Sequence, residues 1–87
     1  MAKLTLATCQ FQVENCPRQN LRSVARQMRA AKRRGAHLVH FSEACLSGYL
    51  GAEIGTLREV DWDAVRDSMA GVLGLAAELK LWVVIGC

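Results

Sequence analysis

The sequence predicts an α/β fold in which three parallel strands alternate with two helices. Three short apolar runs have the length and composition of strands, and two longer segments carry apolar residues at helical spacing. These segments occur in the order strand, helix, strand, helix, strand. Strands that are separated by helices pair in parallel through right-handed crossovers, so this order predicts one parallel sheet.

The first strand is expected over Leu4–Cys9, where apolar and polar residues alternate. After a connection over Gln10–Asn15, Pro17 suits the first position of a helix, because its missing N–H would have no partner there. The apolar stripe of this helix consists of Leu21, Val24, Ala25, Met28 and Ala31. Gly35 follows the basic last turn as a C-cap, so the first helix is predicted over Pro17–Arg34.

A second strand is expected over His37–Phe41, followed by a loop over Ala44–Thr56 that three glycines make conformationally permissive. Asp61 and Asp63 are expected to open a second helix, because carboxylates are favourable near the positive N-terminal end. The apolar stripe of this helix consists of Val65, Met69, Val72, Leu73, Ala76 and Leu79. A third strand is expected over Leu81–Ile85.

The third predicted strand carries no polar residue between Leu81 and Ile85, which is typical of strands buried on both faces. The two helices are expected to cover only one face, so the other face needs a layer from outside these residues. A hydrophobic share of 52% in 87 residues is also high for so short a chain. We therefore interpret residues 1–87 as an incomplete, N-terminal part of one larger domain.

The composition also argues against several classes of protein. No apolar stretch reaches 18 residues, so no membrane span is expected. The segment after Met1 is too short and too polar for a secretory signal, so we expect a cytoplasmic protein whose four cysteines are reduced. Phosphate loops, dinucleotide-binding glycine motifs and nucleophile elbows are absent, and we expect no cofactor.

The first predicted helix carries a dense row of basic residues. They are Arg18, Arg22, Arg26, Arg29, Lys32, Arg33 and Arg34. The row lies opposite the apolar stripe, as a solvated helix face should, and no interleaved aromatic residue or base-reading motif accompanies it. We therefore expect no nucleic-acid binding, and an acidic neighbouring subunit is a better partner for this surface.

The two histidines do not predict a metal site. His37 and His40 are three residues apart on a strand and face opposite sides, so they cannot both bind one metal without distortion. Neither has the spacing of a zinc site. His40 is expected to be a core or interlayer residue with one ring nitrogen hydrogen-bonded.

The strongest candidate for chemistry is Glu43, which follows the second predicted strand. Sites in open α/β sheets are built at the carboxyl ends of strands, and a carboxylate partly removed from water there can act as a general base. The alternatives are that Glu43 caps a turn or pairs with a surface arginine. Cys45 would share its face on an extended chain. It lacks a local lysine or histidine, so packing is the better interpretation for this thiol.

These segments resemble the opening of the nitrilase, or carbon–nitrogen hydrolase, superfamily. The matching residues are Gln10, Asn20, Gly35, Ala36, Phe41, Glu43, Leu46, Gly48 and Tyr49. The resemblance extends from Leu4 to Gly86 and is most specific around Glu43. It departs from the usual pattern at Ser42, where proline is usual.

The resemblance implies a four-layer αββα sandwich, of which this chain supplies the first βαβαβ. Members hydrolyse amides, nitriles or carbamoyl groups with a Glu–Lys–Cys triad and commonly form homo-oligomers. Glu43 matches the glutamate, which would take the thiol proton and later help water attack the thioester, while the lysine would stabilise the oxyanion. Tyr49 is expected at the rim of the pocket as a substrate-binding residue.

The lysine and the nucleophilic cysteine of the superfamily lie well beyond the third strand, and Lys80 and Cys87 are not at matching positions. We therefore expect the 87 residues alone to be inactive and poorly stable. The rival hypothesis is a small, non-enzymatic α/β binding or assembly module that uses the basic helix Arg18–Arg34. It predicts a cooperatively folded monomer whose partner binding weakens with salt.

Overall fold

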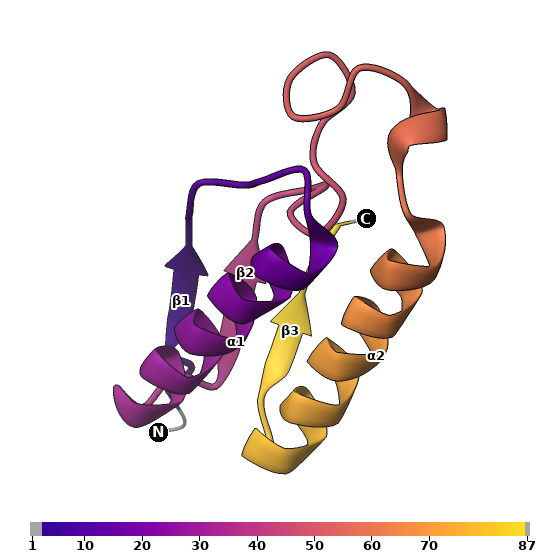
Figure 1. Cartoon of the computed structure of the whole chain (residues 1–87). Helices are drawn as coiled ribbons and strands as arrows, with labels where there is room; N and C mark the ends of the chain where they lie inside the picture. Colours follow the sequence, from indigo (N-terminus) through magenta and orange to yellow (C-terminus); the bar gives the residue numbers. More distant parts are fainter. Residues whose placement is uncertain (1–2, 87) are drawn as a thin grey trace.

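The computed structural model describes residues 3–86, and it contains the elements that the sequence predicts (Figure 1). They are β1 (Leu6–Cys9), α1 (Pro17–Arg33), β2 (Leu38–Phe41), the 3-10 helix η1 (Leu57–Glu59), α2 (Trp62–Leu79) and β3 (Trp82–Val84). The predicted strands and first helix are correct to within two residues at each end. The unpredicted element is η1, which is a single turn between the long loop and α2.

The three strands form one parallel sheet in the order β1-β2-β3. Leu6 lies opposite Leu38, and Leu38 lies opposite Trp82. Both helices pack on the same face of this sheet (Figure 1). The α/β class and the parallel pairing are therefore confirmed.

Local sequence signals explain where the helices begin and end. Pro17 occupies the start of α1, and Gly35 follows its end with a φ of +86°, a conformation that glycine adopts without steric cost. The carboxylate of Asp61 caps α2 by accepting the N–H of Ala64 at 3.0 Å. Asp63 lies in the first turn of the same helix.

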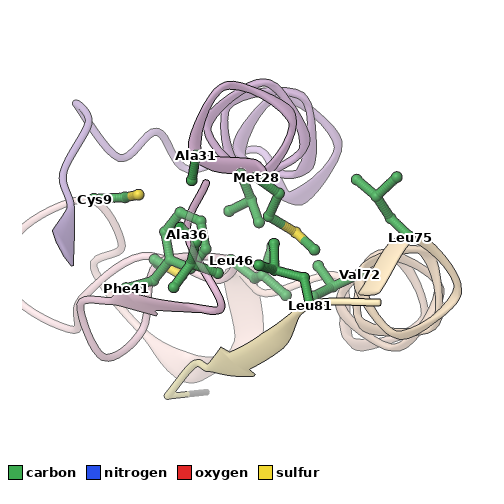
Figure 2. Close-up of a cluster of buried hydrophobic side chains, with 12 residues drawn as sticks. Cys9, Met28, Ala31, Ala36, Phe41, Leu46, Val72, Leu75 and Leu81 are labelled. Atoms are coloured by element: carbon green, nitrogen blue, oxygen red, sulfur yellow. The ribbon is translucent and has the colours of Figure 1, made fainter. Parts of the chain in front are cut away.

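The core lies between the sheet and the two helices. One buried cluster contains Val39 and Phe41 of β2, Met28 of α1, Val72 of α2 and Leu46 of the following loop. Figure 2 shows Phe41, Met28, Val72 and Leu46 of this cluster. One predicted core position is wrong, since Leu73 is 64% exposed. The basic residues of α1 are all exposed, on the side opposite its buried stripe, as predicted.

The second face of the sheet is open. Leu6, Trp82 and Val84 are 57%, 77% and 50% exposed. The third strand is therefore not buried on both faces within this chain, because the only helices in residues 3–86 lie on the other side. His40 is also exposed on this face, so it is not a core residue within residues 3–86. The alternative that it lies between two layers stays a prediction.

The chain is elongated and exposes more surface than a compact domain of its mass. The chain measures 49 × 21 × 16 Å and exposes 5956 Å² of surface. A compact folded monomer of 9.6 kDa exposes about 5,100 Å². No helix within residues 3–86 is long and apolar enough to cross a membrane.

Candidate functional site

Glu43 lies at the carboxyl edge of the sheet, two residues after β2 ends at Phe41. Its neighbours in the chain rise from this edge as a long loop, which reaches η1 before α2 begins (Figure 1). Glu43 is exposed, whereas the sequence predicted partial burial. The carboxylate is therefore accessible to solvent.

The backbone turns sharply immediately after Glu43. Ala44 has a φ of +56°, a left-handed conformation that is uncommon for a residue with a Cβ, and its carbonyl accepts the N–H of Gly48 at 2.8 Å. The turn sends Cys45 into the core while Glu43 stays outside. The expectation that these two side chains could share a face is therefore wrong, since the chain is not extended between them.

The turn also brings Tyr49 back to Glu43. The Tyr49 hydroxyl donates a hydrogen bond to the Glu43 carboxylate, and the Tyr49 N–H donates to Glu53 Oε1 at 2.9 Å. The hydrogen bond with Glu43 raises the pKa of Tyr49 above its usual value, with smaller contributions from burial and from the negative charge of Glu43. Tyr49 thus remains a proton donor to the carboxylate at neutral pH.

Asn20 of α1 forms hydrogen bonds to the main chain of this loop and of the connection after β1. Its side chain is 1% exposed. Its Oδ1 accepts the Glu14 N–H at 2.8 Å, and its Nδ2 donates to the carbonyls of Glu14 at 2.7 Å and Leu46 at 2.8 Å. One buried amide therefore joins α1 to the connection after β1 and to the loop after β2.

No lysine of the described chain can meet Glu43. Lys3 precedes β1, Lys32 lies in the last turn of α1, and Lys80 lies between α2 and β3. All three are at the amino edge of the parallel sheet, and Glu43 is at the carboxyl edge. Lys80 is therefore not the lysine partner of Glu43, in agreement with the sequence analysis.

Two of the described thiols, those of Cys9 and Cys45, are buried and are therefore poor candidates for a nucleophile. Cys9 is buried at the end of β1, and burial raises the pKa of its thiol. Cys45 is fully buried in the core. Cys87 lies outside the described residues. Within residues 3–86, no group of histidine, cysteine and carboxylate side chains could hold a metal ion.

The structure has two surface hollows that Glu43 and Tyr49 do not line. One of 350 Å³ is formed at the amino end of β3 by Ala76, Ala77, Lys80, Leu81 and Trp82. Another of 160 Å³ lies beside β1, between Cys9 and Arg34. Neither is lined by Glu43 or Tyr49, so the hollows do not add a pocket to this site.

The sequence predicted the position of Glu43 but not the hydrogen bonds that fix the loop around it. The hydrogen bond from Tyr49 depends on the left-handed turn at Ala44, for which alanine gives no signal. Asn20 did leave a signal, since a polar residue one turn before Val24 falls on the apolar side of α1. A buried polar side chain at such a position requires hydrogen-bond partners.

Comparison with known proteins identifies the family of the chain and not the role of any residue. The family model for carbon-nitrogen hydrolases matches residues 5–87, which is nearly the whole chain. No curated protein and no solved structure gives a significant match. The resemblance found from the sequence is confirmed at the level of the family.

Proposed function

The chain belongs to the carbon–nitrogen hydrolase family, and on that premise we propose that Glu43 is the general base of a hydrolase acting on non-peptide C–N bonds. The observation that carries the proposal is the position of Glu43. Its carboxylate projects from the carboxyl edge of a parallel sheet, is open to solvent and accepts a hydrogen bond from Tyr49. The substrate class is a small amide, nitrile or carbamoyl compound, and the protein is cytoplasmic.

The proposed chemistry uses Glu43 twice. It first takes the proton of a cysteine thiol, and the thiolate attacks the carbonyl carbon of an amide or carbamoyl substrate. The C–N bond then breaks, the proton leaves with the amine, and a thioester remains. Glu43 next takes a proton from water, which attacks the thioester and releases the acid and the thiol. A lysine stabilises the oxyanion in both halves.

We propose that the lysine and the cysteine are supplied from beyond residue 87. The placement of Lys3, Lys32 and Lys80 at the opposite edge of the sheet supports this. Tyr49 keeps its proposed place at the rim of the substrate pocket. Its hydroxyl also orients Glu43, since a donor on one carboxylate oxygen leaves the other oxygen for the thiol.

The open face of the sheet supports a larger domain. A second sheet packed on Leu6, Trp82 and Val84 would give the four-layer αββα sandwich, with His40 between the layers. It would also bring other strand ends to the carboxyl edge beside Glu43. We further propose a homo-oligomer for the complete hydrolase.

The test begins with the coding sequence downstream of Cys87. It is expected to contain a lysine and, further on, a cysteine at a strand-to-helix turn; their absence would overturn the triad. In the full-length product, Glu43→Gln is expected to lower ammonia release from amide and carbamoyl substrates by about 10³-fold or more.

Glu78→Gln is the matched control, because it makes the same change at an exposed position of α2. It should leave turnover unchanged. Retained activity in Glu43→Gln would contradict the assignment of the base. Turnover by the 87 residues alone that Glu43→Gln abolishes would contradict the claim that lysine and cysteine come from elsewhere.

The exposed basic face of α1 favours a second candidate function, a contact surface for an acidic protein partner. All seven basic side chains from Arg18 to Arg34 are exposed on one helix. Binding through this surface should weaken steeply as salt rises, because exposed charges are screened. A partner whose binding does not respond to salt would contradict this candidate.

A further inference from the structure

Gly86, two residues after the end of β3, lies against the main chain of Glu43. A Cβ on Gly86 would lie 2.7 Å from Glu43 Cα, 2.8 Å from Glu43 Cβ and 3.6 Å from Glu43 N. Non-bonded carbon atoms are most stable at about 3.5–4.0 Å. Even the smallest side chain at position 86 would therefore overlap the main chain of Glu43.

The need for glycine here arises from space and not from backbone conformation. Gly48 has a φ of +90°, which disfavours other residues wherever it occurs, but the φ of Gly86 lies outside the left-handed region. At Gly55 the nearest obstacle is the flexible end of Glu59, which can move aside. At Gly86 the obstacle is backbone, and it cannot move without displacing Glu43.

The sheet explains why the two residues meet. His40 of β2 pairs with Val84 of β3, so both chains leave the sheet side by side at the same edge. The chain after β2 then turns at Ala44, and Glu43 lies directly against Gly86. We infer that Gly86 is a positioning residue, whose missing side chain sets where the main chain of Glu43 lies and so whether its carboxylate reaches Tyr49.

The effect of Gly86 on catalysis rests on the proposed function of Glu43 as a base. The effect of Gly86 on the position of Glu43 does not, and this is the structural part of the inference. The hydrogen bond between Tyr49 and Glu43 reports the structural part directly. Tyr49 is the only tyrosine of the chain, so its ionisation can be followed by ultraviolet absorbance without interference from another phenol. Its pKa is raised chiefly by the bond to Glu43.

The experiment titrates the 87-residue chain and four variants at alkaline pH. Tyr49 of the unsubstituted chain should ionise above the usual tyrosine value, and Glu43→Gln should lower its pKa. Gly86→Ala should lower the pKa to the value found for Glu43→Gln, and the larger Gly86→Val should do the same. Gly74→Ala is the control, since a Cβ there meets nothing within 4 Å.

Each result decides the structural claim. Because Gly86 lies beyond the strand and outside the core, circular dichroism should show the same helix content in Gly86→Ala as in the unsubstituted chain. Loss of helix would contradict a local effect. An unchanged Tyr49 pKa in Gly86→Ala, or an ordinary tyrosine pKa in the unsubstituted chain, would overturn the inference.

Activity of the full-length hydrolase separates this inference from the proposed function. Gly86→Ala should lower kcat while Gly74→Ala leaves it unchanged. If the Tyr49 pKa falls in Gly86→Ala but both Gly86→Ala and Glu43→Gln keep full activity, the proposed role of Glu43 is wrong. The positioning of Glu43 by Gly86 would still hold. Full activity in Gly86→Ala alone would contradict the catalytic importance of the contact.

Discussion

The covered and open faces of the sheet are built by the same three strands, yet they have opposite environments. Phe41 is 2% exposed on the covered face, and Trp82 is 77% exposed on the open one. Both faces carry large apolar side chains, so apolar character does not by itself decide burial. The difference lies in the layers, since residues 3–86 provide helices for one face only.

Removing an aromatic ring from each face should give the largest contrast. Phe41→Ala is expected to lower the free energy of unfolding by about 3–5 kcal/mol, because it leaves a cavity under α1. Trp82→Ala should change it by no more than about 0.5 kcal/mol. Urea unfolding followed by circular dichroism measures both. A large effect of Trp82→Ala on the free energy of unfolding would contradict the exposure of this face, because Trp82 would then be covered in solution.

The buried amide of Asn20 should have the next largest effect. Asn20→Ala removes three hydrogen bonds and leaves the backbone groups of Glu14 and Leu46 without that partner, at a cost of about 2–4 kcal/mol. Gln19→Ala is the control, because Gln19 is exposed on the same turn of α1. Equal urea midpoints for the two variants would contradict the stabilising role of the Asn20 hydrogen bonds. They would mean that water satisfies the backbone groups of Glu14 and Leu46 equally well.

The open face should also be measurable as a surface that binds a hydrophobic dye. Replacing Trp82 and Val84 together by threonine keeps strand propensity and removes apolar area, so dye fluorescence before the thermal transition should fall several-fold. Leu73→Thr is the control, since Leu73 is an exposed leucine on α2, away from this face. An equal fall in Leu73→Thr would mean that the open face is not the binding surface.

The smallest effect on stability is expected for the hydrogen bond between Tyr49 and Glu43, which lies at the carboxyl edge of the sheet and on neither face. The pKa of Tyr49 is raised in the folded chain, so the bond to Glu43 stabilises the fold fully below the unfolded tyrosine value, which is about 10. This stabilisation is lost as the pH rises through the higher folded value. The change is small, because both groups are exposed.

Thermal melts at neutral and alkaline pH measure this dependence. Tyr49→Phe should show a smaller loss of Tm at alkaline pH than the unsubstituted chain, since it has no phenol to ionise. Identical alkaline losses in the two proteins would contradict a bond between Tyr49 and Glu43 in solution.

The elements of the fold could be predicted because their signals are local. Pro17 and Gly35 mark the ends of α1 through backbone chemistry, and Asp61 marks the start of α2 through its carboxylate. Leu73 was wrongly predicted to be buried, because helical spacing identifies an apolar stripe but not how many residues at its edges are covered. Whether a flank of that stripe is covered depends on how α2 sits beside α1, and nothing local encodes that distance.

The site was predictable only in part. Glu43 could be placed at the edge of the sheet, because its position follows from the end of β2. Its surroundings could not be predicted, since Ala44 adopts a conformation that alanine rarely takes and Gly86 approaches from another strand. Such contacts join segments that are far apart in the sequence, and no spacing rule connects them.

The strand order of the sheet is also the order of synthesis. β1 is made first, β2 pairs with it, and β3 adds to β2, so each strand emerging from the ribosome meets a neighbour that is already present. Translation proceeds at about 5–20 residues per second, and each crossover can close before the next strand appears. Each strand can therefore pair as soon as it is made, while the apolar side chains of Leu6, Trp82 and Val84 stay exposed to solvent.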